Sequence, residues 1–258
     1  MIIGERVHAQ PYDPSSGAVV VIDPANKQNI KGYVHIAFAW GEQLTPPQYL
    51  VRGLINLKET INRWTGIEAV LDNHLLLGTP RLLKMPFVYI TTDRAFELTG
   101  PEKENVKKYL ENGGFMVLEN ATPLYEESQA KASLKQMIRD ALGSKARFEP
   151  IPNDHPLYHC FYDFDDGPPI GSEIGMVRVG SGTKLKDNIR YLSDGTVMAK
   201  QVLYLEGVWI GDRLVALYSD KGYIVRWKDL TDNDPQMKMG INMIVFALTQ
   251  KGGIATII

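Results

Sequence analysis

Apolar runs typical of buried strands alternate with amphipathic segments over the first half of this sequence. The run at 33–40 (YVHIAFAW) is continuous and β-prone, as in strands that are buried on both faces. Between Pro47 and Thr65 the apolar residues recur at steps of three and four, which indicates one face of a helix. Strands that alternate with helices pair in parallel through helical crossovers. We therefore expect an α/β fold with a mainly parallel sheet.

The alternation continues to about residue 151. Thr99 and Glu102 have the spacing of a capping box, and Gly113 follows where a helix would end, so this helix is well delimited. The expected strands are 67–72, 85–91, 114–119 and 146–151, and the expected helices are 100–112 and 126–142.

The last third of the chain has a different pattern. Tight-turn sequences at 193–196 (SDGT), 210–213 (IGDR) and 219–222 (SDKG) lie between apolar runs, which predicts β-hairpins over 175–226. A terminal helix, capped by Asp234 and apolar nearly all round, is expected to run to Gly252. Residues 1–32 are rich in Pro, Asp and Gly and read as an irregular arm with one short strand, so 33–258 is expected to be a single α/β domain.

Composition limits the classes of partner that we expect for this protein. A chain of 258 residues that is 44% hydrophobic can bury a large core. The 28 basic and 30 acidic residues give a net charge of −2 without long charged blocks, which argues against nucleic acid as a partner. No apolar stretch approaches the roughly 20 residues of a membrane span, so direct membrane insertion is not expected. The single cysteine excludes an internal disulfide.

A polar crevice is expected at one edge of the sheet. In open parallel sheets, ligands bind outside the carboxyl ends of the strands. The alternative is that these loops are polar only because Asp, Asn and Thr favour turns. The polar residues that follow the expected strands, and so form the candidate crevice, are Asp93, Arg94, Glu119, Asn120, Asp154 and His155.

The expected crevice has no nucleophile. Hydrolases of this topology place a Ser or Cys on the sharp turn after a strand, but the corresponding turn here reads VLENATP. Cys160 lies far along the chain from that turn, and an isolated Cys is more often a small buried hydrophobe. Amidotransferase-type nucleophilic catalysis is therefore not expected.

The segment 153–164 (NDHPLYHCFYDF) suggests a metal site, because His155 and His159 are four residues apart. Helical zinc enzymes with this spacing carry a Glu after the first His, whereas this chain has Pro156. Asp154 or His155 capping a short turn, with Pro156 in its first position, is the favoured interpretation. A cation shared by His155, His159 and Asp163 is a weaker alternative, and we expect neither metal nor cofactor.

Several blocks together resemble a known bacterial family. They are PFVYIT, YLENGGFMVLEN, NDHPLYHCFYDF, LEGVWIGDRLVALYSD and KMGINMIVFALTQ, in this order between Pro86 and Gly252. The family is domain of unknown function 4159. The resemblance implies a flavodoxin-like, three-layer fold similar to the class I glutamine amidotransferases, with C-terminal hairpins added and without an established catalytic residue.

The resemblance also implies a location in the cell envelope or periplasm, because family members often carry a signal peptide or membrane anchor. The first ten residues lack the apolar region of roughly 7 to 15 residues that a signal peptide needs, so the alternatives are a cytoplasmic protein or a signal upstream of this sequence. The chain departs from the family at 91–94, where it has TTDR and many members have TGHG, and at Glu119 and Asn120, where many have two aspartates.

Two hypotheses for function follow. The first is a non-catalytic interaction or ligand-sensing module, with protein partners in an envelope assembly and possible homo-oligomers. The second is a hydrolase or transferase in which Asp93 and Glu119 act with His155 as acid or base. The second requires these three side chains to converge on one small molecule.

Overall fold

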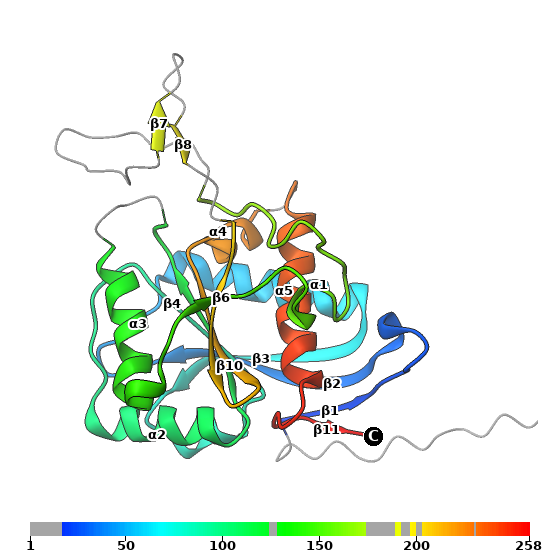
Figure 1. The fold of residues 1–258 in the computed structure, drawn as a ribbon, viewed down its shortest axis with the longest axis horizontal. Helices are drawn as coiled ribbons and strands as arrows, with labels where there is room; N and C mark the ends of the chain where they lie inside the picture. The colour runs from blue at the N-terminus through cyan, green and yellow to red at the C-terminus, as the bar shows by residue number, and fades with distance from the viewer. Residues whose placement is uncertain (1–16, 124–127, 174–188, 192–196, 200–202, 230) are drawn as a thin grey trace, which may run out of the picture.

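The sheet is built outward from β2 (Lys31–Trp40), the first of the buried runs in the sequence. In the computed structural model, β2 pairs in parallel with β3 along one edge and with β4 along the other. β4 pairs in parallel with β5, and β5 with β10 (Figure 1). Taken in chain order, these five parallel strands lie in the order 2-1-3-4-5. Their bounds are Gly66–Leu76 for β3, Phe87–Thr92 for β4, Phe115–Asn120 for β5 and Arg213–Ser219 for β10.

The structure describes residues 17–123, 128–173, 189–191, 197–199, 203–229 and 231–258. Shorter strands extend the sheet. β1 (Ala18–Val21) runs antiparallel to the first half of β2, and β11 (Thr256–Ile257) pairs with β1. On the far side, β9 (Glu206–Ile210) forms a hairpin with β10, and β6 (Glu149–Pro150) pairs antiparallel with β9. A separate antiparallel pair joins β7 (Ile189–Tyr191) to β8 (Val197–Ala199).

Helices cover both faces of the sheet. Side chains of a strand alternate between its two faces, so Phe87 and Tyr89 join one core cluster while Val88 and Ile90 join the other. The first cluster contains α1 (Val51–Trp64), α4 (Tyr223–Trp227) and α5 (Asp234–Thr249), and the second contains α2 (Gly100–Glu111) and α3 (Gln129–Leu142). The result is three layers, helices on both sides of a mostly parallel sheet (Figure 1).

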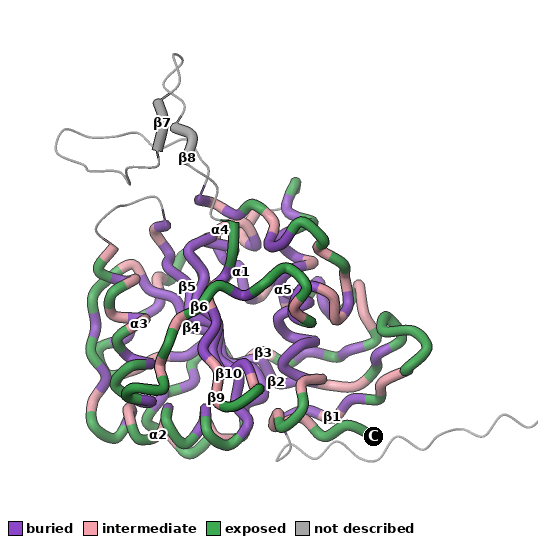
Figure 2. Tube along the Cα trace, in the orientation of Figure 1, coloured by how far each residue is buried: buried purple, intermediate pink, exposed green. Residues whose placement is uncertain are grey.

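The two long helices of the first face differ in how much they bury. α1 is amphipathic and buries Leu54, Leu57 and Ile61 completely, each of which stabilises the fold by about 1.5–3 kcal/mol. α5 is buried almost along its whole length (Figure 2). The segment around the short 3-10 helix η5 (Pro156–Tyr158) covers α5 from outside. The Asn242 side chain of α5 donates a hydrogen bond to Leu157 O of this segment at 3.1 Å. The expectation of a buried terminal helix is confirmed.

Most of the predicted elements are present. The strands at 33–40, 67–72, 85–91 and 114–119 are β2, β3, β4 and β5, and the helix at 100–112 is α2, with its capping box formed by Thr99 and Glu102. The helix expected at 126–142 begins at Gln129, with the Ser128 hydroxyl as its cap. Within the described residues, no helix is both long and apolar enough to cross a bilayer.

Two predictions about the second half were wrong. The segment 146–151 is not the next parallel strand, because only Glu149 and Pro150 pair, and they pair antiparallel with β9. The SDKG sequence at 219–222 is not a hairpin turn but joins β10 to α4. Gly222 makes this possible with its left-handed φ of 63°, and a Cβ there would lie 2.1 Å from Ser172 Oγ. The next parallel strand is therefore β10.

Other boundaries shift by a few residues. The IGDR sequence is the β9–β10 hairpin turn as predicted, whereas SDGT at 193–196 lies outside the described residues. Asn233, not Asp234, is the N-cap of α5, and the helix ends at Thr249. The described part of the expected arm contains β1, with Ala18 and Val20 buried, and β2 starts before residue 33.

Candidate functional site

Glu119 closes the carboxyl end of β5. It is the fifth residue of β5 and is wholly buried on the face that carries α1, α4 and α5. The Tyr89 hydroxyl donates to its Oε2, the Ser219 hydroxyl donates to Oε1 at 2.8 Å, and the Ile224 amide of α4 donates to Oε2 at 2.8 Å. The carboxylate thus joins β4, β5, β10 and the first turn of α4.

The electrostatics of Glu119 follow from this setting. Burial raises the pKa of the carboxyl above its ordinary value, and the hydrogen bonds from Tyr89, Ile224 and Ser219 act in the opposite direction. A buried carboxylate is tolerated when donors replace its lost water. Both oxygens of Glu119 accept hydrogen bonds from the chain's own groups.

Asn120 and the neighbouring polar residues form a second closed cluster at the same edge. The Asn120 side chain donates to Asp220 Oδ1 at 2.8 Å and accepts from Ser128 Oγ at 2.9 Å. Lys131 of α3 reaches the other oxygen of Asp220 at 3.1 Å. The cluster therefore fastens the start of α3 to the ends of β5 and β10.

Asp93 and Arg94 lie beyond the end of β4, where the sequence predicted them. Arg94 is exposed, Asp93 is partly buried, and the Arg94 Nε is 3.6 Å from Asp93 Oδ1. The Arg94 amide donates to the Thr92 hydroxyl at 3.2 Å, a local turn contact of the kind that favours polar residues in loops. The four candidates Asp93, Arg94, Glu119 and Asn120 do share the carboxyl edge of the sheet.

Asp154 and His155 do not lie at that edge. Asp154 is exposed, and the His155 ring packs against Trp209 and Phe246 with centroids 6.4 and 5.3 Å apart. Trp209 pairs with Leu214 at the start of β10, so His155 is near the amino ends of the parallel strands. It was misplaced because 146–151 is not a parallel strand, and the chain after β6 instead crosses over α5.

The geometry keeps His155 away from Asp93 and Glu119. Glu119 is in register with Ser219, and the level of Trp209 and His155 corresponds to Leu214. These levels are five residues apart on β10, roughly 16 Å at about 3.3 Å per residue. The three side chains do not converge on one small molecule, so the geometry gives the acid–base hypothesis no support.

The predicted capped turn is η5, and His155, one of the two candidates that the sequence offered, is its cap. Its Nδ1 accepts the Leu157 amide at 3.1 Å, and Pro156 follows in the first position of the turn. Burial lowers the pKa of the imidazole, and the Asp154 carboxylate partly opposes this. Because Nδ1 accepts the Leu157 amide, the neutral form of the ring carries its proton on Nε2.

His159 and Asp163 lie in a different environment from His155. His159 Nδ1 is 3.3 Å from Asp163 Oδ1, and the same oxygen accepts Lys27 Nζ at 2.6 Å. The Lys27 ammonium therefore occupies the position next to Asp163 Oδ1 that a metal cation would need. Across the described parts of the chain, no group of three or more His, Cys, Asp or Glu side chains is placed to hold a metal ion.

Cys160 is a partly buried thiol without the features of a nucleophile. Its Sγ donates to Asn242 O at 3.2 Å. Burial raises the pKa of the thiol to about 12, whereas reactive cysteines have lowered values.

Sequence reasoning missed a buried ion pair beside the closed edge. Lys221 Nζ lies 2.7 Å from Glu173 Oε1, and the two side chains are 0% and 2% exposed. Burial is the main influence on both groups, lowering the pKa of Lys221 and raising that of Glu173. The signal in the sequence was the Lys of SDKG, which we interpreted as part of a hairpin turn.

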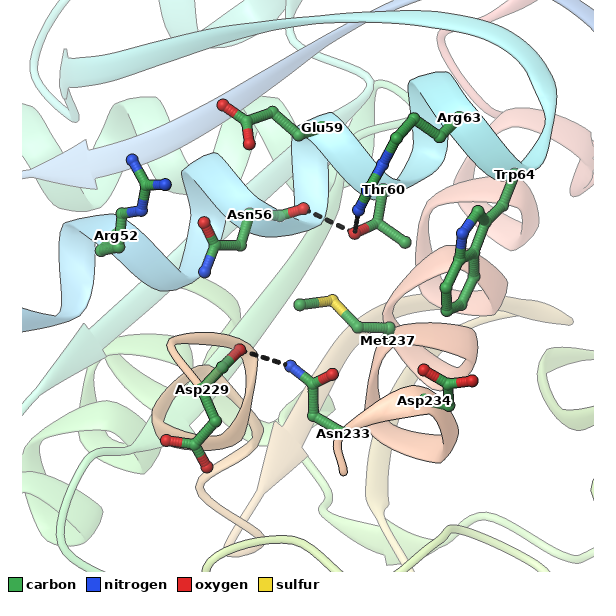
Figure 3. Close-up of a pocket in the computed structure, with 10 residues that line it drawn as sticks. All are labelled: Arg52, Asn56, Glu59, Thr60, Arg63, Trp64, Asp229, Asn233, Asp234 and Met237. Carbon is green, nitrogen blue, oxygen red and sulfur yellow. Dashed lines mark hydrogen bonds between the residues drawn. The ribbon is translucent and has the colours of Figure 1, made fainter. Parts of the chain in front are cut away.

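A small cavity of about 270 Å³ lies between α1 and the loop that leads into α5 (Figure 3). Its central polar groups are already paired. Asn56 donates to Trp227 O at 2.9 Å, Thr60 donates to Asn56 O at 2.8 Å, and Asn233 donates to Asp229 O at 2.8 Å. The Met237 side chain lies between the two walls (Figure 3). These contacts hold α1 against the α4–α5 connection.

A larger cavity, of about 630 Å³, opens beside His155. It lies between the β9–β10 turn and the last turn of α5, at the amino ends of the strands. Phe246 and Leu214 give it apolar walls, and Arg213 and Gln250 contribute polar groups. Its size is within the range of small-molecule sites.

Comparison with known proteins adds one match. A search of curated proteins finds no match for the chain. The sequence model described as domain of unknown function (DUF4159) matches residues 47–248, a span that runs from the segment before α1 almost to the end of α5 and includes Glu119, His155 and Lys221. Because this span is most of the chain, the protein belongs to the DUF4159 family.

Proposed function

We propose that the protein is a non-catalytic module that acts by binding. The observation that carries this proposal is the state of Glu119, which is wholly buried with both carboxylate oxygens bonded to the chain's own donors. In doubly wound sheets this edge is where ligands and reacting groups meet. Here the same edge holds secondary-structure elements together.

A glutamine amidotransferase-like ancestry is the finer part of the proposal. The strand order 2-1-3-4-5 is that of flavodoxin-like sheets, and helices cover both faces. The last two residues of β5 are Glu119 and Asn120, and the turn that follows them has no Ser or Cys where a hydrolase of this topology needs a nucleophile. The proposed module thus keeps a hydrolase-like scaffold and uses the position of the nucleophile for structure.

The partner proposed is another protein of a cell-envelope assembly. The family resemblance supports this location, and the near-neutral charge of −2 disfavours nucleic acid. The position of this protein in such an assembly is a proposal that the following experiment tests.

The test is chemical crosslinking in the native host with the tagged full chain at its natural abundance. We expect a defined partner that crosslinks in a fixed ratio and co-elutes after purification. Recovery of the chain only as a free monomer under crosslinking would contradict the proposal.

A parallel assay separates binding from catalysis. The purified chain is incubated with glutamine and with generic ester and phosphoester substrates, beside a Glu119→Asp variant that keeps the carboxylate but shortens its reach. We expect no turnover by either protein. Turnover by the natural chain would show that the non-catalytic role is wrong, and its loss in a Glu119→Asp variant that still folds would place Glu119 in the reaction.

A further inference from the structure

The cavity beside His155 has the dimensions and lining of a ligand site that nothing in the proposed binding role requires. It measures about 630 Å³, against 300–1,000 Å³ for typical small-molecule sites. Phe246, Leu214 and Ile210 line it with apolar surface. A ligand with an apolar body of modest size would fit these walls.

His155 supplies one fixed donor to this cavity. Its Nδ1 accepts the Leu157 amide at 3.1 Å, so the neutral ring carries its proton on Nε2. Among the described residues, Nε2 has no hydrogen-bond partner, although the ring is held in place by Phe246 and Trp209. The ring therefore presents a preorganised N–H for an acceptor.

Gln250 is a second polar group that lacks a partner. It follows α5 as the C-cap and lines the same cavity. Both its side-chain oxygen and nitrogen are buried without a hydrogen bond to any described residue. A buried amide in this state is unfavourable, and a rotation of the side chain toward the cavity would let a polar ligand supply the missing partner.

Charge around the cavity favours an anion. Arg213 and Lys251 contribute two positive charges, and Asp212 contributes one negative charge. The Arg213 guanidinium is fixed in place because it donates to Gly114 O at 2.9 Å and to Leu110 O. The lining therefore has an excess of positive charge close to the apolar walls.

We propose that this cavity binds a small organic carboxylate, with its apolar body against Phe246 and Leu214 and its carboxylate accepting from His155 Nε2. This proposal goes beyond the binding role proposed above, because it stands whether or not a protein partner is found. The site lies at the edge of the sheet opposite Glu119.

The test is titration of the isotopically labelled full chain with benzoate, cyclohexanecarboxylate and hexanoate, followed by amide chemical shifts. We expect saturable shifts at Asp212, Leu214 and Gly252 for at least one carboxylate, with much weaker shifts for the matched neutral amide. Absence of saturation with all three probes at about 10 mM, a concentration that detects even millimolar affinity, would overturn the proposal.

Two variants locate the binding. His155→Asn keeps an oxygen to cap the Leu157 amide but removes the Nε2 donor, and we expect at least a tenfold loss of affinity. Lys251→Glu is an exposed charge reversal that leaves the core intact, and a loss of threefold or more is expected.

The matched control is Lys107→Glu on the exposed face of α2, which makes the same change in net charge at a residue that does not line the cavity. Its affinity should equal that of the natural chain. Equal affinities for the natural chain, His155→Asn and Lys251→Glu would overturn the proposal, as would shifts that gather around the cavity between α1 and α5.

Discussion

A buried carboxylate can be a reacting group or an anchor, and its partners distinguish the two. Glu119 accepts from hydroxyls on β4 and β10 and from the first turn of α4. A general acid or base needs a hydrogen bond to substrate, and the described contacts of Glu119 are all internal. These contacts are those of a structural anchor.

Replacing Glu119 with Gln should destabilise the protein by roughly 2–4 kcal/mol. The reason is that the NH₂ of the amide would face groups that now donate hydrogen bonds to the carboxylate. The measurement is urea unfolding, where a lower midpoint at constant slope reports lost stability. The control is Glu104→Gln on the exposed face of α2, expected to change stability by about 0.5 kcal/mol or less. Equal stability of the two variants would show that Glu119 is not an anchor.

His155 should make stability depend on pH. Burial lowers its pKa below the ordinary 6.5, so the unfolded chain takes up a proton more readily than the folded one. The stability that the neutral, buried ring contributes is fully present above pH 6.5, and it is lost as the pH falls through the pKa of His155 in the folded chain.

We expect the free energy of unfolding to drop more between about pH 7.5 and about pH 5 in the natural chain than in His155→Asn, since titration near 6.5 is a histidine property. Burial also lowers the pKa of His35, and that contribution is common to both proteins. Urea unfolding at the two pH values measures the difference. Parallel pH dependences would contradict the burial of His155.

Among the secondary-structure elements, β3 is an edge strand, since among the described strands it pairs only with β2. Side chains from neighbouring segments occupy backbone groups of β3 that another strand could otherwise pair with. The Asn62 side chain accepts the Ala69 amide at 2.7 Å, Thr65 Oγ1 accepts the Ile67 amide at 3.0 Å, and Trp40 Nε1 donates to Asn73 O at 2.9 Å. Exposed edges are templates for pairing unless their backbone groups are blocked. Side chains of α1, the α1–β3 turn and β2 block this one.

Removing the Asn62 side chain should expose that edge. Asn62→Ala leaves the Ala69 amide and carbonyl unpaired, and we expect concentration-dependent association through β3. Sedimentation velocity over a concentration series measures this, with the exposed Gln48→Ala as the matched control. A variant that sediments like the natural chain at all concentrations would show that these caps do not govern association.

The elements that the sequence predicted well are those with local signals. The capping box of Thr99 and Glu102 delimits α2, and the continuous apolar run of β2 fixes the central strand. The SDKG turn could not be read correctly, because a glycine with left-handed φ serves equally in a hairpin or at the start of a helix. Only the parallel pairing of Ser219 with Glu119 decides between them.

At the scale of the whole molecule, the predicted location of the site depended on which strand pairs in parallel with β5. Asp93, Arg94, Glu119 and Asn120 were placed correctly at the carboxyl edge because β4 and β5 are parallel neighbours. Asp154 and His155 were placed there only if 146–151 continued the parallel series, and β10 takes that position instead. Long-range strand pairing is not encoded in any short stretch, so the opposite edge and its cavity were not predictable.

The closed carboxyl edge is most directly tested by native-state hydrogen exchange at the Ile224 amide, which donates to Glu119 Oε2 at 2.8 Å. Core amides exchange only through large-scale opening, whereas open or mobile sites exchange with little free-energy cost. We predict that Ile224 is protected to the same degree as amides in the middle of β5. Exchange of Ile224 orders of magnitude faster than β5 would contradict a closed edge and return Glu119 to the list of reacting groups.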